Sequence, residues 1–97
     1  MKTEFTIKER HEIYIRAKEF YLSGLLGNNI IFGLCYVICE AIYYKYEFVC
    51  GYKYIENMFS EFAKHKPKSA RNKVYWWGKN NTKKRIEVLD NCIEQTK

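Results

Sequence analysis

The sequence lacks most of the motifs that identify enzymes. It has no Gly-rich phosphate loop, no HExxH or GxSxG motif and no carboxylate pair, and its only histidines are His11 and His65. Such motifs place a nucleophile, a metal or a phosphate beside the groups that act on it. Without them an organised catalytic site has little support. We therefore expect no enzyme and no cofactor.

The four cysteines lack the spacing of metal or disulfide sites. Cys35, Cys39, Cys50 and Cys92 form no CxxC pair and no dense framework of the secreted type. Cys35 and Cys39 stand four residues apart and could share a metal, but structural zinc sites usually use CxxC pairs on a turn. We expect no metal, and thiols that are buried as small apolar side chains.

Long apolar runs are also absent. Residues 30–44 are apolar apart from Glu40, whereas a membrane-spanning helix needs about 20 such residues. The first residues carry no apolar signal core. We therefore expect a cytoplasmic protein with reduced thiols and no membrane contact. The apolar run is predicted to be a helix covered on most sides in the core.

The chain of 97 residues suits a single domain. Apolar residues at helical spacing predict helices over residues 6–22, 30–42, 52–64 and 82–96. Thr6 and Glu9 fit a capping box at the start of the first helix. The predicted fold is all-α: a single helical domain over 1–97, with about four helices around an apolar second helix and a basic, aromatic-containing loop before the last helix.

The amphipathic faces of the last two helices make a sharper prediction. In the third helix, Glu56, Asn57, Ser60 and Glu61 are predicted to lie on the polar side. Pro67 should end that helix, because the residue before a proline avoids helical dihedrals. In the last helix, capped by Asn81 or Thr82, the residues predicted to point inward are Ile86, Leu89 and Ile93.

Positive charge is concentrated in one segment. Residues 64–85 carry nine Lys or Arg and no Asp or Glu, and all of the net charge of +6 lies in the second half of the chain. Charge needed only for solubility has no reason to gather in this way, so the pattern favours a localised anionic partner. The alternative is a basic loop that is simply solvated.

Three consecutive aromatics, Tyr75, Trp76 and Trp77, lie inside this basic segment. Successive side chains cannot all face one way, so at least one ring should look away from the core or lie at an interface. An exposed ring could stack on a base or contact another subunit. The alternative is that the tryptophans close the end of the bundle.

The start of the last helix is the best local candidate for an anion site. The first backbone N–H groups of a helix are free and its dipole is positive there. Thr82, Lys83, Lys84 and Arg85 occupy this turn, and cations at a helix start need something negative to compensate them. The alternatives are an exposed basic turn, or Arg85 paired with Glu40 or Glu61.

Glu40 is the lone charge in the apolar run, and an unpaired carboxylate there would be costly. We expect a salt bridge to Arg16, Arg71 or Arg85. A hydrogen bond to a ligand and an acid–base role are the alternatives.

Two groups of residues resemble a loose group of small accessory proteins of tailed bacteriophages. These are residues 32–35, which enter the apolar helix, and the Tyr-Trp-Trp element of residues 75–77 followed by Arg85 and Leu89. The group carries a GLC-like helix, a WW or WF element and a closing RxxxL helix. The resemblance implies that Gly33, Cys35, Trp76, Trp77 and Arg85 are family-typical positions. It also implies a host-takeover or counter-defence protein that acts by stoichiometric binding in the host cytoplasm.

The leading functional prediction is a non-enzymatic protein that binds a nucleotide-like or other phosphate-bearing small molecule, as a homo-oligomer whose subunits close the pocket together. One alternative is a protein that binds nucleic acid, through the predicted third helix and the basic loop or through backbone contacts alone. The other is an inhibitor that binds an acidic surface of a host protein. The residues predicted to bind the ligand are Arg71, Lys73, Tyr75, Trp76, Trp77, Thr82, Lys84 and Arg85.

Overall fold

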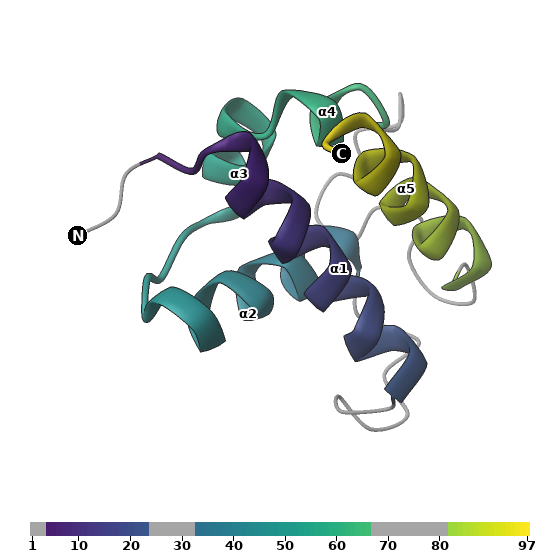
Figure 1. Cartoon of the computed structure of the whole chain (residues 1–97). Helices are drawn as coiled ribbons and strands as arrows, with labels where there is room; N and C mark the ends of the chain where they lie inside the picture. The colour runs from purple at the N-terminus through teal and green to yellow at the C-terminus, as the bar shows by residue number, and fades with distance from the viewer. Residues whose placement is uncertain (1–3, 24–32, 67–81) are drawn as a thin grey trace.

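The computed structural model describes residues 4–23, 33–66 and 82–97, and these residues form helices and no strand. The helices are α1 (Ile7–Ser23), α2 (Leu34–Tyr46), α3 (Tyr52–Met58), α4 (Ser60–Ala63) and α5 (Thr82–Gln95). Figure 1 shows α1 crossing the middle of the molecule between α2 and α5, with α3 and α4 along one side. The predicted all-α bundle is confirmed. The additional helix is α4, a four-residue piece of the predicted third helix.

The start of α1 follows the predicted capping box. Thr6 N–H donates to Glu9 Oε1 at 2.9 Å, and Glu9 N–H donates to Thr6 Oγ1 at 3.1 Å. Two backbone donors that have no partner within the helix are satisfied in this way. One face of α1 is then buried against α2 and α5.

The second helix starts later than predicted. Gly33 is extended, with φ −73° and ψ 170°, and α2 begins at Leu34. A helix from residue 30 therefore cannot run through Gly33 without interruption. The prediction that α2 is a core helix is confirmed, because it contributes the buried residues Leu34, Cys35, Val37, Ile38, Ala41 and Ile42.

The predicted third helix is broken at Phe59. This residue has φ −109° and ψ 81°, outside helical geometry, so α3 ends at Met58 and α4 begins at Ser60. The break turns Phe59, Glu61 and Phe62 inward together, each less than 10% exposed. The predicted placement of Glu61 on the polar side was wrong, because periodicity in a continuous helix does not anticipate the break.

The last helix is rotated relative to its predicted face. Leu89 is buried as expected, but Ile86 and Ile93 are only half-buried. The residues of α5 that face the core are Arg85, Val88, Leu89 and Cys92, followed by Thr96 just beyond the helix. His11 of α1 contributes to this orientation, since its Nδ1 lies 3.1 Å from both Ile93 O and Thr96 Oγ1.

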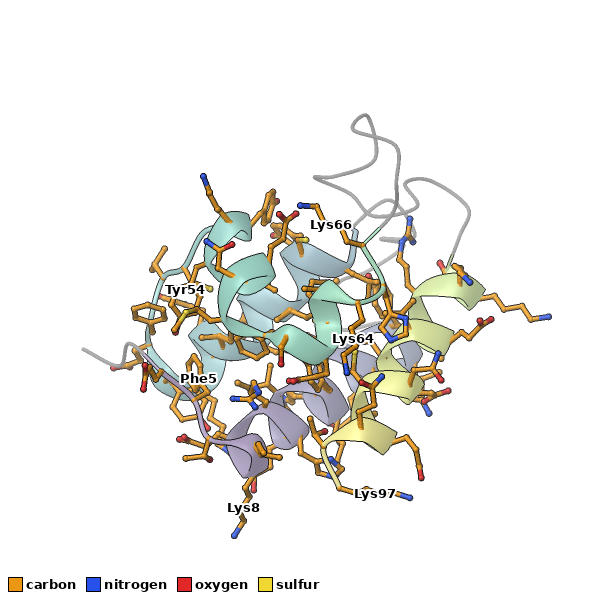
Figure 2. All side chains as sticks on the ribbon, turned by 90° about the horizontal axis from the view of Figure 1, so that it is seen from above. Phe5, Lys8, Tyr54, Lys64, Lys66 and Lys97 are labelled. Atoms are coloured by element: carbon orange, nitrogen blue, oxygen red, sulfur yellow. The ribbon has the colours of Figure 1, made fainter. Side chains whose placement is uncertain are left out.

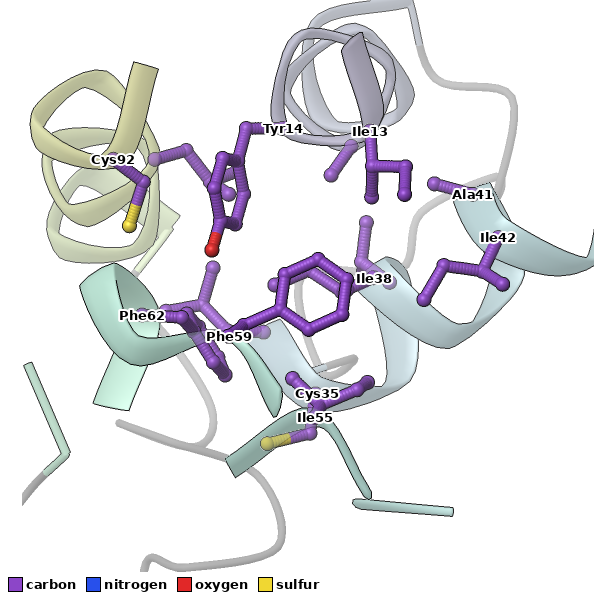
Figure 3. Close-up of a cluster of buried hydrophobic side chains, with 14 of the residues drawn as sticks. Ile13, Tyr14, Cys35, Ile38, Ala41, Ile42, Ile55, Phe59, Phe62 and Cys92 are labelled. Atoms are coloured by element: carbon purple, nitrogen blue, oxygen red, sulfur yellow. The ribbon is translucent and has the colours of Figure 1, made fainter. Parts of the chain in front are cut away.

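The core lies where α1, α2 and the α3–α4 pair converge. Phe59 occupies its centre, with its ring 5.8 Å from the ring of Tyr14 and 5.8 Å from that of Phe5. Figure 3 shows Phe59 between Ile38 of α2 and Tyr14 of α1, with Cys92 of α5 beyond Tyr14. None of the described helices is both long and apolar enough to cross a bilayer.

Candidate functional site

The structure describes three of the eight residues predicted to bind a ligand. Thr82, Lys84 and Arg85 lie together in the first turn of α5. The other five predicted residues are Arg71, Lys73, Tyr75, Trp76 and Trp77, and they lie outside the described residues. The participation of aromatic rings therefore stays a prediction.

The guanidinium of Arg85 is enclosed by protein. The residue is 0% exposed, and its Nη1 donates to Thr82 Oγ1 at 3.3 Å. Burial lowers the pKa of Arg85, while the nearby Tyr21 of α1 acts in the opposite direction. A positive charge is thus held beneath the first turn of α5, where the positive end of the helix dipole also lies.

His65, which follows α4, lies in the same positive potential. Burial lowers the pKa of His65, and the positive charges of Lys84 and Lys64 lower it further. Lys64 lies beside α5 (Figure 2), where its Nζ donates to Gln95 Oε1 at 3.2 Å. Lys84 reaches Glu87 Oε1 at 3.4 Å. His65 Nε2 likewise lies 3.4 Å from Gln95 Nε2, and Gln95 is the last residue of α5. Basic groups therefore extend along α5, from Lys84 and the enclosed Arg85 at its start to Lys64 and His65 beside its end, and we call these four residues the basic surface.

Glu61, one of the two carboxylates considered as partners of Arg85, is bound elsewhere. Its Oε1 accepts from Arg10 Nε at 2.7 Å and from Tyr14 Oη at 2.9 Å, and its Oε2 accepts from Ser60 Oγ at 3.2 Å. Burial alone would raise the pKa of Glu61, but its hydrogen bonds to backbone, Tyr14 and Arg10 hold that pKa below its ordinary value. This group joins α1 to α4 and is structural.

The Arg10–Glu61–Tyr14 group is the polar feature that sequence reasoning missed. Glu61 carried one signal of its burial, since Phe59 and Phe62 lie on either side of it in the sequence. Burial raises the pKa of Tyr14, as does the neighbouring charge of Glu61. The Tyr14 hydroxyl therefore stays protonated and can donate to the carboxylate.

Glu40, the other carboxylate, does not make the expected ion pair with Arg16. Arg16 pairs with Glu19 on its own helix at 3.3 Å, and Glu40 instead forms a hydrogen bond with Tyr36 one turn earlier on α2. Glu40 is half-buried. Arg71, another of the expected partners, lies outside the described residues. This part of α2 faces a hollow, so Glu40 is less covered than its place in the apolar run suggested.

The hollow, which we call the tyrosine hollow, has a volume of about 620 Å³. It is lined by Tyr36, Cys39, Glu40, Tyr43, Val49, Cys50, Gly51 and Tyr52. Cys35 and Cys92 are buried as predicted, but Cys39 and Cys50 are only half-buried, and their Sγ atoms lie 3.7 Å apart. Within the described part of the chain, no cluster of three or more His, Cys, Asp or Glu could hold a metal ion.

Comparisons of the chain with protein-family models, curated proteins and solved structures find no match. The resemblance to phage accessory proteins therefore depends on the residue patterns alone.

Proposed function

We propose that the protein captures a nucleotide-like or other phosphate-bearing ligand and holds it without chemical change. The observation that carries this proposal is the enclosed guanidinium of Arg85 at the positive end of α5. A buried positive charge acts through a low dielectric and is screened less by salt than a surface charge. It strengthens the field at the first turn of α5, where an anion would find the amide donors of the helix start.

The neighbours of Arg85 support an anionic ligand. Thr82 contributes a hydroxyl, and the exposed side chains of Lys83 and Lys84 contribute charge that can reach a ligand directly. The lowered pKa of His65, due to burial and then to Lys84 and Lys64, indicates that this surface disfavours further positive charge. A phosphate group would relieve that repulsion and accept several charge-assisted hydrogen bonds.

A base or ring of the ligand would stack on one of Tyr75, Trp76 and Trp77, which are adjacent in sequence to this helix. We propose that neighbouring subunits of a homo-oligomer contribute to the same pocket. Large apolar side chains exposed on the described surface, such as Leu22 and Val49, are available for such an interface. In a phage, sequestering a nucleotide signal of the host would serve as a counter-defence.

The proposal predicts binding of a phosphate-bearing ligand that calorimetry can detect and that the NMR signals of His65 and His11 can locate. Calorimetric titration with mono-, di- and cyclic nucleotides and with inorganic phosphate should give heat for at least one member of the panel. In parallel NMR titrations, the bound phosphate should raise the pKa of His65, because negative charge opposes the effect of Lys84 and Lys64. The resonances of His11, which packs against α5 from α1 at Ile93 and Thr96, are the internal control and should not move.

A charge reversal at the basic surface provides the matched test. Lys84→Glu alters an exposed side chain and should lower the affinity for the anion roughly tenfold or more. The reversal replaces an attraction of about 1 kcal/mol, the value for two unit charges in contact in water, by a repulsion of similar size. Lys8→Glu makes the same change at the start of α1, far from the start of α5 in both views, and should leave affinity nearly unchanged. Equal losses in the two variants would indicate a nonspecific effect of net charge and contradict the site.

Two other outcomes would redirect the proposal. Binding only to DNA or RNA, with affinity that collapses as salt rises, would identify a polynucleotide as the ligand. No heat across the whole panel, with no movement of the His65 signal, would remove the small-ligand proposal. Stoichiometric capture of an acidic host protein would then support inhibition of a protein partner.

A further inference from the structure

Two thiols from different parts of the chain meet at the tyrosine hollow. Cys39 lies in α2, and Cys50 lies in the connection between α2 and α3. Their Sγ atoms are 3.7 Å apart, and Cys39 Sγ donates to the backbone oxygen of Cys50 at 3.4 Å. Both residues are half-buried and line the hollow. The pair is therefore accessible to a small molecule, unlike the buried Cys35 and Cys92.

The backbone holds this pair together. Glu47 adopts a left-handed conformation with φ 53°, and its N–H donates to Tyr43 O at 2.8 Å, which ends α2 and reverses the chain. Residues 48–50 then return along α2 to Gly51, the N-cap residue of α3. Phe48 anchors the returning segment by packing its ring 5.3 Å from that of Tyr54. The closeness of the thiols is thus a consequence of packing.

The lining of the hollow suits a small organic ligand. A volume of about 620 Å³ lies within the usual range of small-molecule sites, roughly 300 to 1,000 Å³. Tyr36, Tyr43 and Tyr52 supply aromatic surface, and among the described residues of the lining Glu40 is the only charged one. A neutral or cationic ligand is therefore favoured over an anionic one.

We propose that Cys39 and Cys50 form a thiol–disulfide exchange site that reduces a small neutral or cationic disulfide bound in the tyrosine hollow. The site lies between α2 and α3, on the side of the molecule away from the start of α5 (Figure 1). It is independent of the proposed anion site, so each can fail without the other.

The environments of the two thiols assign their roles. Cys39 Sγ donates to the backbone oxygen of Cys50 at 3.4 Å, which holds Cys39 in its thiol form. Hydrogen bonding to Cys39 lowers the pKa of Cys50, whereas the same interaction and burial raise the pKa of Cys39. The thiolate is the attacking species, so Cys50 is the nucleophile. Cys39 remains a thiol until a mixed disulfide forms beside it.

The exchange balances in two steps. The thiolate of Cys50 attacks one sulfur of the bound disulfide, the S–S bond of the ligand breaks, and one ligand thiolate leaves. The thiol of Cys39 then gives its proton to that departing thiolate or to water and attacks Cys50 Sγ, which expels the second ligand thiolate. The protein is oxidised by loss of two hydrogens to a Cys39–Cys50 disulfide, and the ligand is reduced to two thiols.

The wild-type protein gives the first test, with cystamine as the cationic probe. After incubation, free thiols are alkylated in denaturant and the protein is digested with trypsin, which cuts after Lys45, between the two cysteines. Mass spectrometry should find the two resulting peptides joined through Cys39 and Cys50, with Cys35 and Cys92 alkylated. Four alkylated cysteines, or a disulfide that includes Cys35 or Cys92, would overturn the proposal.

Single substitutions separate the two roles. Cys39→Ser should trap a mixed disulfide between Cys50 and cysteamine, whereas Cys50→Ser should react at least tenfold more slowly at Cys39. Cys35→Ala removes a buried thiol of α2 and should leave the exchange rate unchanged. Equal rates in the two serine variants would refute the assignment of the nucleophile, and the wild-type result stands even if a variant misfolds.

The charge of the probe tests the class of disulfide. Cystamine should react faster than the anionic glutathione disulfide, and Glu40→Gln should shrink the ratio of the two rates by roughly fivefold, the effect of one contact between unit charges in water. Glutathione disulfide reacting as fast as cystamine with the wild-type protein would contradict the proposed class.

Discussion

At the scale of single residues, the contact of Arg10 with Glu61 differs from the other ion pairs of the described residues. The side chains of Arg10 and Glu61 are 17% and 7% exposed. In a pair such as Arg16–Glu19, both side chains are about half exposed. Exposed pairs contribute about 0 to 1 kcal/mol, but removing one partner of a buried pair costs about 3 to 5 kcal/mol, because the other charge stays buried. Stability should therefore depend more on Glu61 than on any exposed acid.

Glu61→Gln tests this at neutral pH. We expect the free energy of unfolding to fall by about 2 to 4 kcal/mol, somewhat less than for a fully buried pair because Arg10 retains some exposure. Urea unfolding measures the change. Glu12→Gln, which removes the partner of Lys45 at an exposed position, is the matched control and should change the midpoint little; equal effects would contradict the special role of Glu61.

The pH dependence of this loss has a definite sign. The folded-state pKa of Glu61 is below its ordinary value of 4.5, so the unfolded chain binds the proton first and the stabilisation is fully present above that value. It is lost as pH falls through the folded pKa. The difference between wild type and Glu61→Gln should therefore shrink in acid, and a difference that stays constant down to the lowest measurable pH would exclude ionisation as its cause.

At the scale of elements, the helix boundaries follow local chemistry to different degrees. The start of α1 was predictable, because Thr6 and Glu9 satisfy each other's backbone donors within four residues of sequence. The break at Phe59 was not, because nothing in its neighbouring residues forbids a helix. It is stabilised by tertiary packing, since Phe59 lies against Phe5 and Tyr14.

Thr6→Ala should destabilise the protein by about 1 kcal/mol, because the Glu9 N–H loses its side-chain acceptor. Chemical denaturation followed by circular dichroism measures the loss. Thr6→Ser keeps the hydroxyl and should retain most of the stability. If serine were as damaging as alanine, the methyl group of Thr6 and not the cap would be responsible.

At the scale of the whole molecule, one core joins segments that are distant in sequence. Ile38 is 0% exposed at the centre of α2, whereas Val49, eleven residues later, is 80% exposed. Small domains have only about 5 to 15 kcal/mol of net stability. The loss of a central aliphatic side chain is therefore a large fraction of the total.

Ile38→Ala should lower the free energy of unfolding by about 2 to 5 kcal/mol, through lost burial and the cavity that remains. Val49→Ala deletes a similar group from the surface and should change it by no more than about 0.5 kcal/mol. Thermal and urea unfolding of both variants measure the contrast. Similar midpoints would mean that the core does not depend on α2.

The sequence by itself determined the helical class, the capped start of α1, the core role of α2 and the concentration of cations ahead of α5. These depend on the spacing of apolar residues and on contacts between near neighbours, which a linear pattern contains. The placement of Thr82, Lys84 and Arg85 in the first turn of the last helix was also predictable, because a helix start is a local feature.

Only the tertiary structure decided the burial of Glu61, the enclosure of Arg85 and the meeting of Cys39 with Cys50. Each depends on which surfaces of separate segments come together: α4 turning inward at Phe59, α5 rotating against α1, and residues 48–50 folding back along α2. Periodicity specifies that a helix has an apolar face, but the neighbours that cover this face are set by packing over the whole chain.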